Sequence, residues 1–126
     1  DFELRIAAPA EFQPNNEILA KAKGNISCTE DIQSAVDGTD MVYTDVWVSM
    51  GMESEKEERL NKLANYQINQ ELLSLAKPNA LVMHCLPAYR GKEIDEDTFE
   101  ANAETIFTQA ENRLHTQKAI LTWLVS

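Results

Sequence analysis

Short apolar runs alternate along the chain with segments whose apolar residues lie three or four positions apart. The runs rich in Val, Ile, Leu, Met and Tyr predict strands at residues 3–8, 25–29, 41–44, 80–86 and 105–107. The segments with helical spacing predict helices at residues 15–23, 29–36, 53–64, 69–76, from Asp95 or Asp97 onward, and 110–125. This alternation predicts an α/β fold with a mostly parallel sheet.

The polar residues between these runs predict where the helices begin and end. Asn15 or Asn16 is expected to cap the first helix, and Asn69 is expected to cap the helix that follows it. Residues 80–86 form a nearly continuous apolar run, which is typical of a parallel strand covered on both faces. We therefore expect one domain of three layers, with helices on both faces of the sheet.

Composition narrows the classes of partner. A hydrophobic content of 44% supports a real core, and 11 basic against 21 acidic residues give a net charge of −10. A surface that negative repels phosphate backbones and anionic lipid, so we expect neither nucleic acid nor membrane as a partner. Cys28 and Cys85 lie far apart and form no CxxC pair, which favours a reducing, cytoplasmic setting.

Candidate chemistry lies after the predicted strands, because ligands of open parallel sheets bind outside the carboxyl ends of the strands. Asp45 ends one strand, and His84 and Cys85 end another. Arg113 follows the last predicted strand, near the expected start of the final helix. An arginine beside a helix N-terminus is a good site for a phosphate or carboxylate.

Each of these residues also has a purely structural interpretation. Asp45 can cap a turn, and Cys85 can be a small buried hydrophobe. His84 cannot form a dyad with Cys85 on a regular strand, because neighbouring side chains point to opposite faces. It is expected to be either a packed residue or one that supports the site from behind. Arg113 can simply pair with Glu111 at the surface.

Metal and nucleotide motifs do not emerge from the sequence. The residues that could ligate a metal lack the usual ligand spacing, and we expect no metal site: they are Cys28, His84, Cys85 and His115. The four scattered glycines form neither a GxGxxG motif nor a P-loop. No cofactor is expected.

Four segments together resemble ornithine carbamoyltransferases. They are DVWVSMG at residues 45–51, YQIN at 66–69, HCLP at 84–87 and ENRLH at 111–115, in the order and approximate spacing of that family. The resemblance runs from about residue 4 to residue 125 and covers essentially the whole chain. It implies carbamoyl transfer from carbamoyl phosphate to the δ-amine of L-ornithine, giving citrulline and phosphate, in arginine metabolism.

The resemblance also implies roles for particular residues. Asp45 is expected to hold the α-amino group of ornithine, and Ser49 and Met50 belong to a Ser-Met-Gly loop that folds over the amino acid. Cys85 is expected to be the catalytic residue, near the reacting amine and the carbamoyl phosphate. The two remaining carbamoyl-phosphate contacts are expected from the backbone of Leu86 and the side chain of Arg113.

The family protein is longer than this chain. No Ser-Thr-Arg-Thr or His-Pro-Thr-Gln type segment of the carbamoyl-phosphate domain occurs in residues 1–126, and the chain begins at Asp1. We therefore expect a partial ornithine-binding domain, Rossmann-like but without its first strand and helix, inactive alone and trimeric only in the whole enzyme. The alternatives are a stand-alone amino-acid-binding or interaction domain, or a carbamoyltransferase for putrescine or acylated ornithine.

Overall fold

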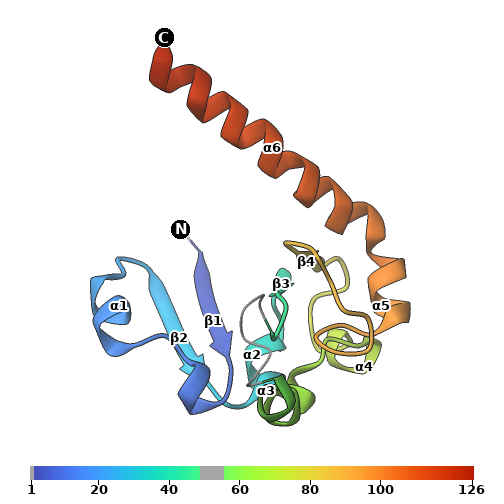
Figure 1. Ribbon diagram of the computed structural model, residues 1–126. Coiled ribbons are helices and arrows are strands. Elements are labelled where there is room, and N and C mark those ends of the chain that lie inside the picture. The colour runs from blue at the N-terminus through green and yellow to red at the C-terminus, as the bar shows by residue number, and fades with distance from the viewer. Residues whose placement is uncertain (1, 49–55) are drawn as a thin grey trace.

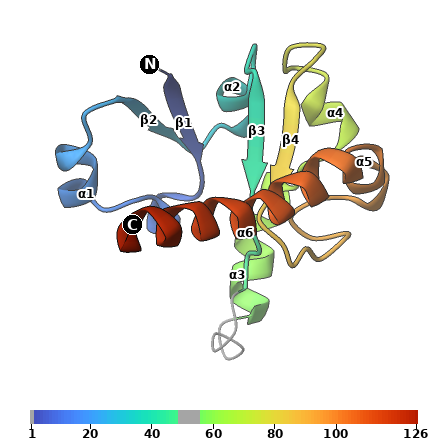
Figure 2. The ribbon, with the colours of Figure 1, turned by 90° about the horizontal axis from the view of Figure 1, so that it is seen from above.

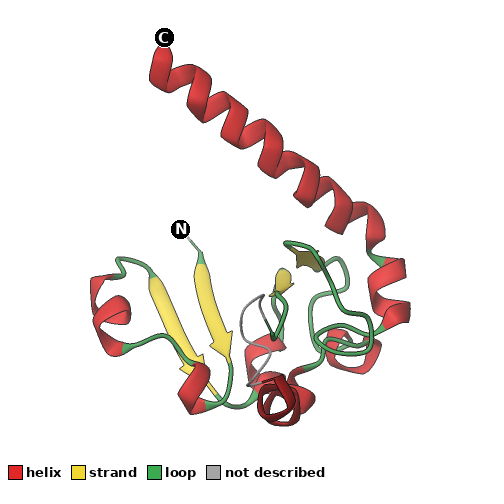
Figure 3. Cartoon of the chain, in the orientation of Figure 1, coloured by secondary structure: helices red, strands yellow, loops and turns green. Residues whose placement is uncertain are grey.

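The computed structural model describes residues 2–48 and 56–126. Its strands are β1 (Glu3–Ala7), β2 (Asn25–Thr29), β3 (Met41–Thr44) and β4 (Leu81–His84). Its α-helices are α1 (Asn16–Lys21), α2 (Ile32–Val36), α3 (Lys56–Leu63), α4 (Gln70–Leu73), α5 (Glu96–Ala101) and α6 (Ala103–Val125). The described residues also form two short 3-10 helices, η1 (Ala10–Phe12) and η3 (Ala64–Tyr66) (Figures 1 and 3).

All four strands pair in parallel, as the sequence predicts, but they do so in two separate sheets. β1 pairs with β2, and β3 pairs with β4. Figure 2 shows the strands in the order β2, β1, β3, β4, with a gap between β1 and β3. The α/β fold with parallel strands is confirmed, and the described strands form two two-stranded sheets because no strand among them lies between β1 and β3 to join the two pairs.

Side-chain caps fix the starts of four helices. Asn15 accepts a hydrogen bond from the amide of Ile18, and Asn69 accepts one from the amide of Leu72. Asp31 and Asp95 cap α2 and α5 in the same way. Because a free amide at the start of each helix is satisfied locally, these short helices begin where the sequence places an Asn or Asp, and the predicted caps are confirmed.

The hydrophobic core lies against the β3–β4 sheet. Its buried residues come from both strands of that sheet, from α2, α4, α5 and α6, and from the loops between them: Val36, Val42, Ile68, Leu72, Val82, Ile94, Phe99 and Ile106. The strands of the β1–β2 sheet contribute no fully buried residue. The two sheets thus share a pairing pattern but differ in how they are covered.

The predicted strand at residues 105–107 is wrong, because these residues lie inside α6. Thr, Ile and Phe have strand propensity, but Ile106 is fully buried as part of the core-facing side of a continuous helix. Tertiary packing therefore outweighs local propensity here. As a consequence, Arg113 lies almost three turns after the start of α6 and not at a helix N-terminus.

The second half of α6 extends away from the rest of the chain (Figure 1). Large apolar side chains on it are exposed: Leu121, Trp123, Leu124 and Val125. Within the described residues, no helix combines the length and the apolar character that a membrane span requires.

Candidate functional site

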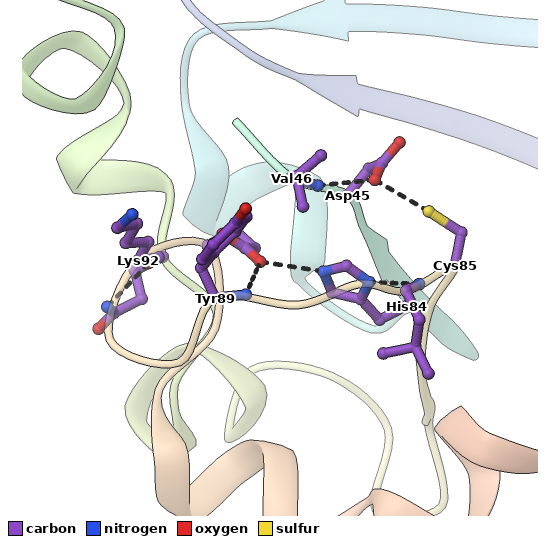
Figure 4. A network of polar contacts seen from close by, with 9 residues as sticks. Asp45, Val46, His84, Cys85, Tyr89 and Lys92 are labelled. Carbon is purple, nitrogen blue, oxygen red and sulfur yellow. Dashed lines mark hydrogen bonds and ion pairs between the residues drawn. The ribbon is translucent and has the colours of Figure 1, made fainter. Parts of the chain in front are cut away.

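The register of β3 and β4 brings Asp45 and Cys85 together. Thr44 pairs with His84, so the residues that follow them leave the sheet side by side at its carboxyl end. The Cys85 thiol donates a hydrogen bond to Asp45 Oδ1 across 2.9 Å (Figure 4). Residues 40 positions apart in the sequence thereby meet at the edge where ligands of parallel sheets bind.

Asp45 both stabilises the turn after β3 and contacts Cys85. Its Oδ1 atom accepts a hydrogen bond from the amide of Val46 at 2.7 Å, which fixes the turn after β3. The same side chain is exposed and receives the Cys85 thiol. A carboxylate held in this way is oriented before any ligand arrives.

The surroundings of Cys85 favour its protonated form. Burial raises the pKa of the Cys85 thiol, and the hydrogen bond to Asp45 and the negative charge of Asp45 raise it further. A hydrogen bond with Tyr43 acts in the opposite direction but is a smaller effect. Because the thiol donates to a carboxylate, Cys85 is a partly exposed polar group and not an inert core residue.

Helix α6 crosses the end of the sheet and is hydrogen-bonded there at two points. Arg113 Nη1 donates to the carbonyl oxygen of Cys85 at 2.9 Å, and Gln109 Nε2 donates to the Tyr43 hydroxyl at 3.0 Å. Residues 109 and 113 are four apart, so they lie on one face of the helix. The guanidinium group therefore reaches the site from the side of α6, with most of its five N–H donors left over.

Behind Cys85 lies a buried polar chain. His84 and Glu93 are both 0% exposed, and His84 Nε2 lies 3.1 Å from Glu93 Oε1. His84 Nδ1 accepts the amide N–H of Leu86 at 2.9 Å, and Glu93 Oε1 accepts that of Tyr89 at 2.6 Å (Figure 4). The prediction that His84 is a packed residue is confirmed, because its side chain is fully buried.

The backbone at Leu86 adopts a conformation that is rare for its residue type. Its φ of 55° lies in the left-handed region, which costs a non-glycine residue about 1–2 kcal/mol. The Leu86–Pro87 peptide bond is cis. Leu86 keeps this conformation only if its surroundings hold it there, and the hydrogen bond from its amide to the His84 ring is one such contact.

Three possible metal ligands lie near this edge. The ligand atoms of Asp45, His84 and Cys85 lie within 4.8 Å of one another, which their sequence spacing did not indicate. However, both ring nitrogens of His84 already have partners, and the Cys85 sulfur is hydrogen-bonded as a thiol. The donor set therefore does not fit a resident metal ion as it stands.

The family model described as aspartate/ornithine carbamoyltransferase, Asp/Orn binding domain, matches residues 1–124. The chain belongs to this family.

Individual carbamoyltransferases resemble the chain over nearly its whole length. It is 48% identical to the ornithine carbamoyltransferase of Campylobacter curvus and 49% identical to that of Sulfurovum sp., covering 97% and 98% of the chain. In each case it spans 42% of the relative's own length. The crystal structure of the anabolic enzyme of Campylobacter jejuni matches with a TM-score of 0.90 at 39% identity, over 98% of this chain and 43% of that one. The Pyrococcus furiosus enzyme matches with a TM-score of 0.83 at 39% identity, over 94% and 40%.

Sequence reasoning predicted some of the residues that lie together at the end of β3–β4 and missed others. Ser49 and Met50 lie outside the described residues. Tyr43 and Gln109 were missed, although Tyr43 shares a strand face with Asp45 and Gln109 shares a helix face with Arg113. Glu93 gave no signal at all, because an acidic residue in a loop is normally exposed.

Proposed function

We propose that this chain is the ornithine-binding part of an ornithine carbamoyltransferase, which transfers the carbamoyl group of carbamoyl phosphate to the δ-amine of L-ornithine. The observation that supports this most is the meeting of a carboxylate, a thiol and a guanidinium at the carboxyl end of β3–β4. The substrates are an amino acid with two ammonium groups and a phosphorylated anion. A site with one anionic and one cationic side chain suits that pair.

Asp45 is the proposed partner of the ornithine α-ammonium group. Its carboxylate is exposed and already oriented by the Val46 amide, so little ordering is needed when the cation binds. The Cys85 thiol donates a hydrogen bond to Oδ1 of this carboxylate. Binding of the ammonium therefore changes the surroundings of Cys85 directly.

Cys85 is the proposed catalytic residue beside the δ-amine, which must lose a proton before it attacks the carbamoyl carbon. Burial raises the pKa of Cys85, and the hydrogen bond to Asp45 and the charge of Asp45 raise it further. When an ammonium neutralises that charge, the thiol pKa falls toward its usual value, and a thiolate becomes more available as a proton acceptor. Substrate binding and activation of Cys85 are coupled in this proposal.

Arg113 and the Leu86 backbone are the proposed partners of carbamoyl phosphate. Arg113 uses one N–H on the Cys85 carbonyl oxygen, so the rest of its planar fork remains for the phosphate. Polar groups of the turn at Leu86 lie next to the thiol and contact the carbamoyl group. A donor held between a guanidinium and a fixed turn is oriented for attack.

The Ser-Met-Gly loop with Ser49 and Met50 is proposed to cover ornithine and exclude water from the hydrolysable donor. Its sequence favours free L-ornithine over putrescine or an acylated ornithine as the acceptor. A stand-alone amino-acid-binding domain is the alternative of a different class, and the assay described below separates the two.

For the whole protein, we propose a carbamoyl-phosphate domain joined to this one, in a cytoplasmic trimer. The gap between β1 and β3 (Figure 2) supports one further parallel strand there. It would complete a three-layer Rossmann-like sheet in the order β2, β1, new strand, β3, β4. Two free cysteines suit a reducing compartment.

The proposal is tested by carbamoyl transfer in the longer protein, with L-ornithine, putrescine and N-acetyl-L-ornithine as competing acceptors. We expect citrulline formation with a preference for L-ornithine of about 100-fold or more in kcat/KM. No transfer to any acceptor would favour the binding domain, and a preference for another amine would overturn the substrate. The 126-residue chain by itself should form no citrulline.

In the same assay, Arg113→Ala should lower kcat/KM for carbamoyl phosphate about 100-fold or more, since a charged donor to the anion is lost. Arg90→Ala is the matched control, because Arg90 pairs with Glu100 at 2.6 Å and lies outside the proposed site. Equal effects of the two substitutions would contradict the role of Arg113.

A further inference from the structure

We infer that Glu93 and His84 are positioning residues: their buried chain of hydrogen bonds holds the Leu86 backbone and thereby sets where the Cys85 thiol lies. Neither side chain reaches the exposed edge of the site, since both are fully buried. The expected effect on kcat rests on the proposed function. The expected effect on the reactivity of the Cys85 thiol does not.

The direction of the hydrogen bonds follows from the chemistry of their partners. An amide N–H can only donate, so His84 Nδ1 is an acceptor toward Leu86. The ring proton of neutral His84 is therefore on Nε2, where it donates to Glu93 Oε1. Glu93 thus fixes both the tautomer and the orientation of the ring that the Leu86 amide needs.

The same carboxyl oxygen of Glu93 holds the far end of the loop. Glu93 Oε1 also accepts the amide N–H of Tyr89, so one atom is bonded to both His84 and Tyr89, on either side of residues 85–88. The loop is therefore fixed at its beginning through His84 and at its end through Tyr89. Between these two points lie Cys85 and the left-handed Leu86.

A backbone in a sparsely populated conformation persists only where its surroundings determine it. At Leu86 the described contact to the amide is the His84 ring, and the described contact to that ring is Glu93. If the chain is broken, we expect Leu86 to relax toward negative φ and the Cys85 thiol to leave Asp45. The separation from Asp45 makes the thiol more reactive, because Asp45 no longer stabilises its protonated form.

The test is alkylation of the full chain by iodoacetamide across pH, with both cysteines followed separately by mass spectrometry. Glu93→Ala should raise the rate at Cys85 about three- to tenfold near neutral pH and move its profile to lower pH. Cys28 should keep its rate, which distinguishes a local change from unfolding. Glu93→Gln keeps an oxygen acceptor for both donors, so this conservative variant should restore the parent profile.

Control variants make the outcome decisive. Thr98→Val alters an equally buried polar residue of the same core whose hydroxyl has no partner, and it should leave Cys85 unchanged. If Glu93→Ala does not fold, His84→Gln replaces it, since glutamine offers an amide near Nε2 but no acceptor at Nδ1. A parent-like Cys85 profile in folded Glu93→Ala or His84→Gln overturns the inference. So does a Glu93→Gln profile as altered as that of Glu93→Ala.

The catalytic arm uses the longer protein. Glu93→Ala should lower kcat about tenfold or more, because a small displacement of reacting groups is expensive. KM for L-ornithine should change less than about threefold, because Asp45 follows the other strand, β3. An unchanged kcat in an active enzyme would contradict the inference, whereas an inactive parent protein would defeat only the proposed function.

Discussion

The two sheets of the molecule are built alike but covered differently. Each consists of two short parallel strands. The β3–β4 sheet has a buried core on it and carries Asp45 and Cys85 at its end, whereas the strands of the β1–β2 sheet contain no fully buried residue. The difference shows that two paired strands are not sufficient to form a functional site. Asp45 and Cys85 are held at the end of the sheet that helices also cover.

Several contacts between the β1–β2 part of the chain and the β3–β4 part are polar and exposed. Arg5 Nη1 donates to the carbonyl oxygen of Asp37 at 2.8 Å, and the Tyr66 hydroxyl donates to that of Glu30 at 2.9 Å. Lys62 pairs with Glu11 at 2.7 Å. Exposed contacts of this kind contribute about 0–1 kcal/mol each, so we expect the β1–β2 sheet to be the less stable half.

The largest expected effect is on the free energy of unfolding, and it compares the packing of the two sheets. Phe99 is 2% exposed in the core beside β4, and Phe99→Ala should lower the free energy of unfolding by about 3–5 kcal/mol. Ile6 in β1 is only half-buried, and Ile6→Ala should cost about 1 kcal/mol. Urea denaturation followed by circular dichroism measures both values. Equal losses would mean that the two sheets are equally well packed.

Phe107 provides a matched control for Phe99. The two rings meet edge to face at a centroid distance of 6.0 Å, but Phe107 is 53% exposed. Phe107→Ala should therefore cost only about 1 kcal/mol, from the aromatic contact and its partial burial.

An intermediate effect is expected at the site itself. Asp45→Asn removes the charge that raises the pKa of Cys85. The pKa should fall, so more thiolate is present at a given pH and alkylation near neutral pH should be about three- to tenfold faster. A pH profile of Cys85 alkylation measures this shift. An unchanged or higher midpoint would show that Asp45 does not act on the thiol.

The smallest effect is expected on the distal part of α6. Trp123 is 77% exposed, and Trp123→Ala should change the free energy of unfolding of this chain by no more than about 0.5 kcal/mol. In a longer protein where that face is covered, the same substitution should cost several times more. A large loss in this chain alone would mean that Trp123 packs against something.

Sequence patterns predicted the parts of this molecule that depend on local rules. Asn15, Asn69 and Asp95 cap their helices because a cap needs only its own next few residues. Strand ends placed Asp45 and Cys85, since parallel pairing puts carboxyl ends together.

Other features depend on contacts between residues far apart in the sequence, so local sequence rules did not predict them. The helical state of residues 105–107 depends on burial of Ile106 against the sheet, and the left-handed Leu86 depends on a ring bonded to Glu93. The break between the sheets could not be predicted either, because alternating strands and helices do not reveal which edges remain unpaired.

The most direct test of the site is protection of Cys85 by substrate. In the longer protein with phosphate present, the test is made at a pH above the pKa of Cys85, where a fall of that pKa no longer changes the fraction of thiolate. There L-ornithine should slow the alkylation of Cys85 and leave that of Cys28 unchanged, because the amino acid covers the end of β3–β4. Asp45→Asn should abolish this protection. Equal rates at Cys85 with and without saturating L-ornithine, in a protein that forms citrulline, would contradict the placement of the site.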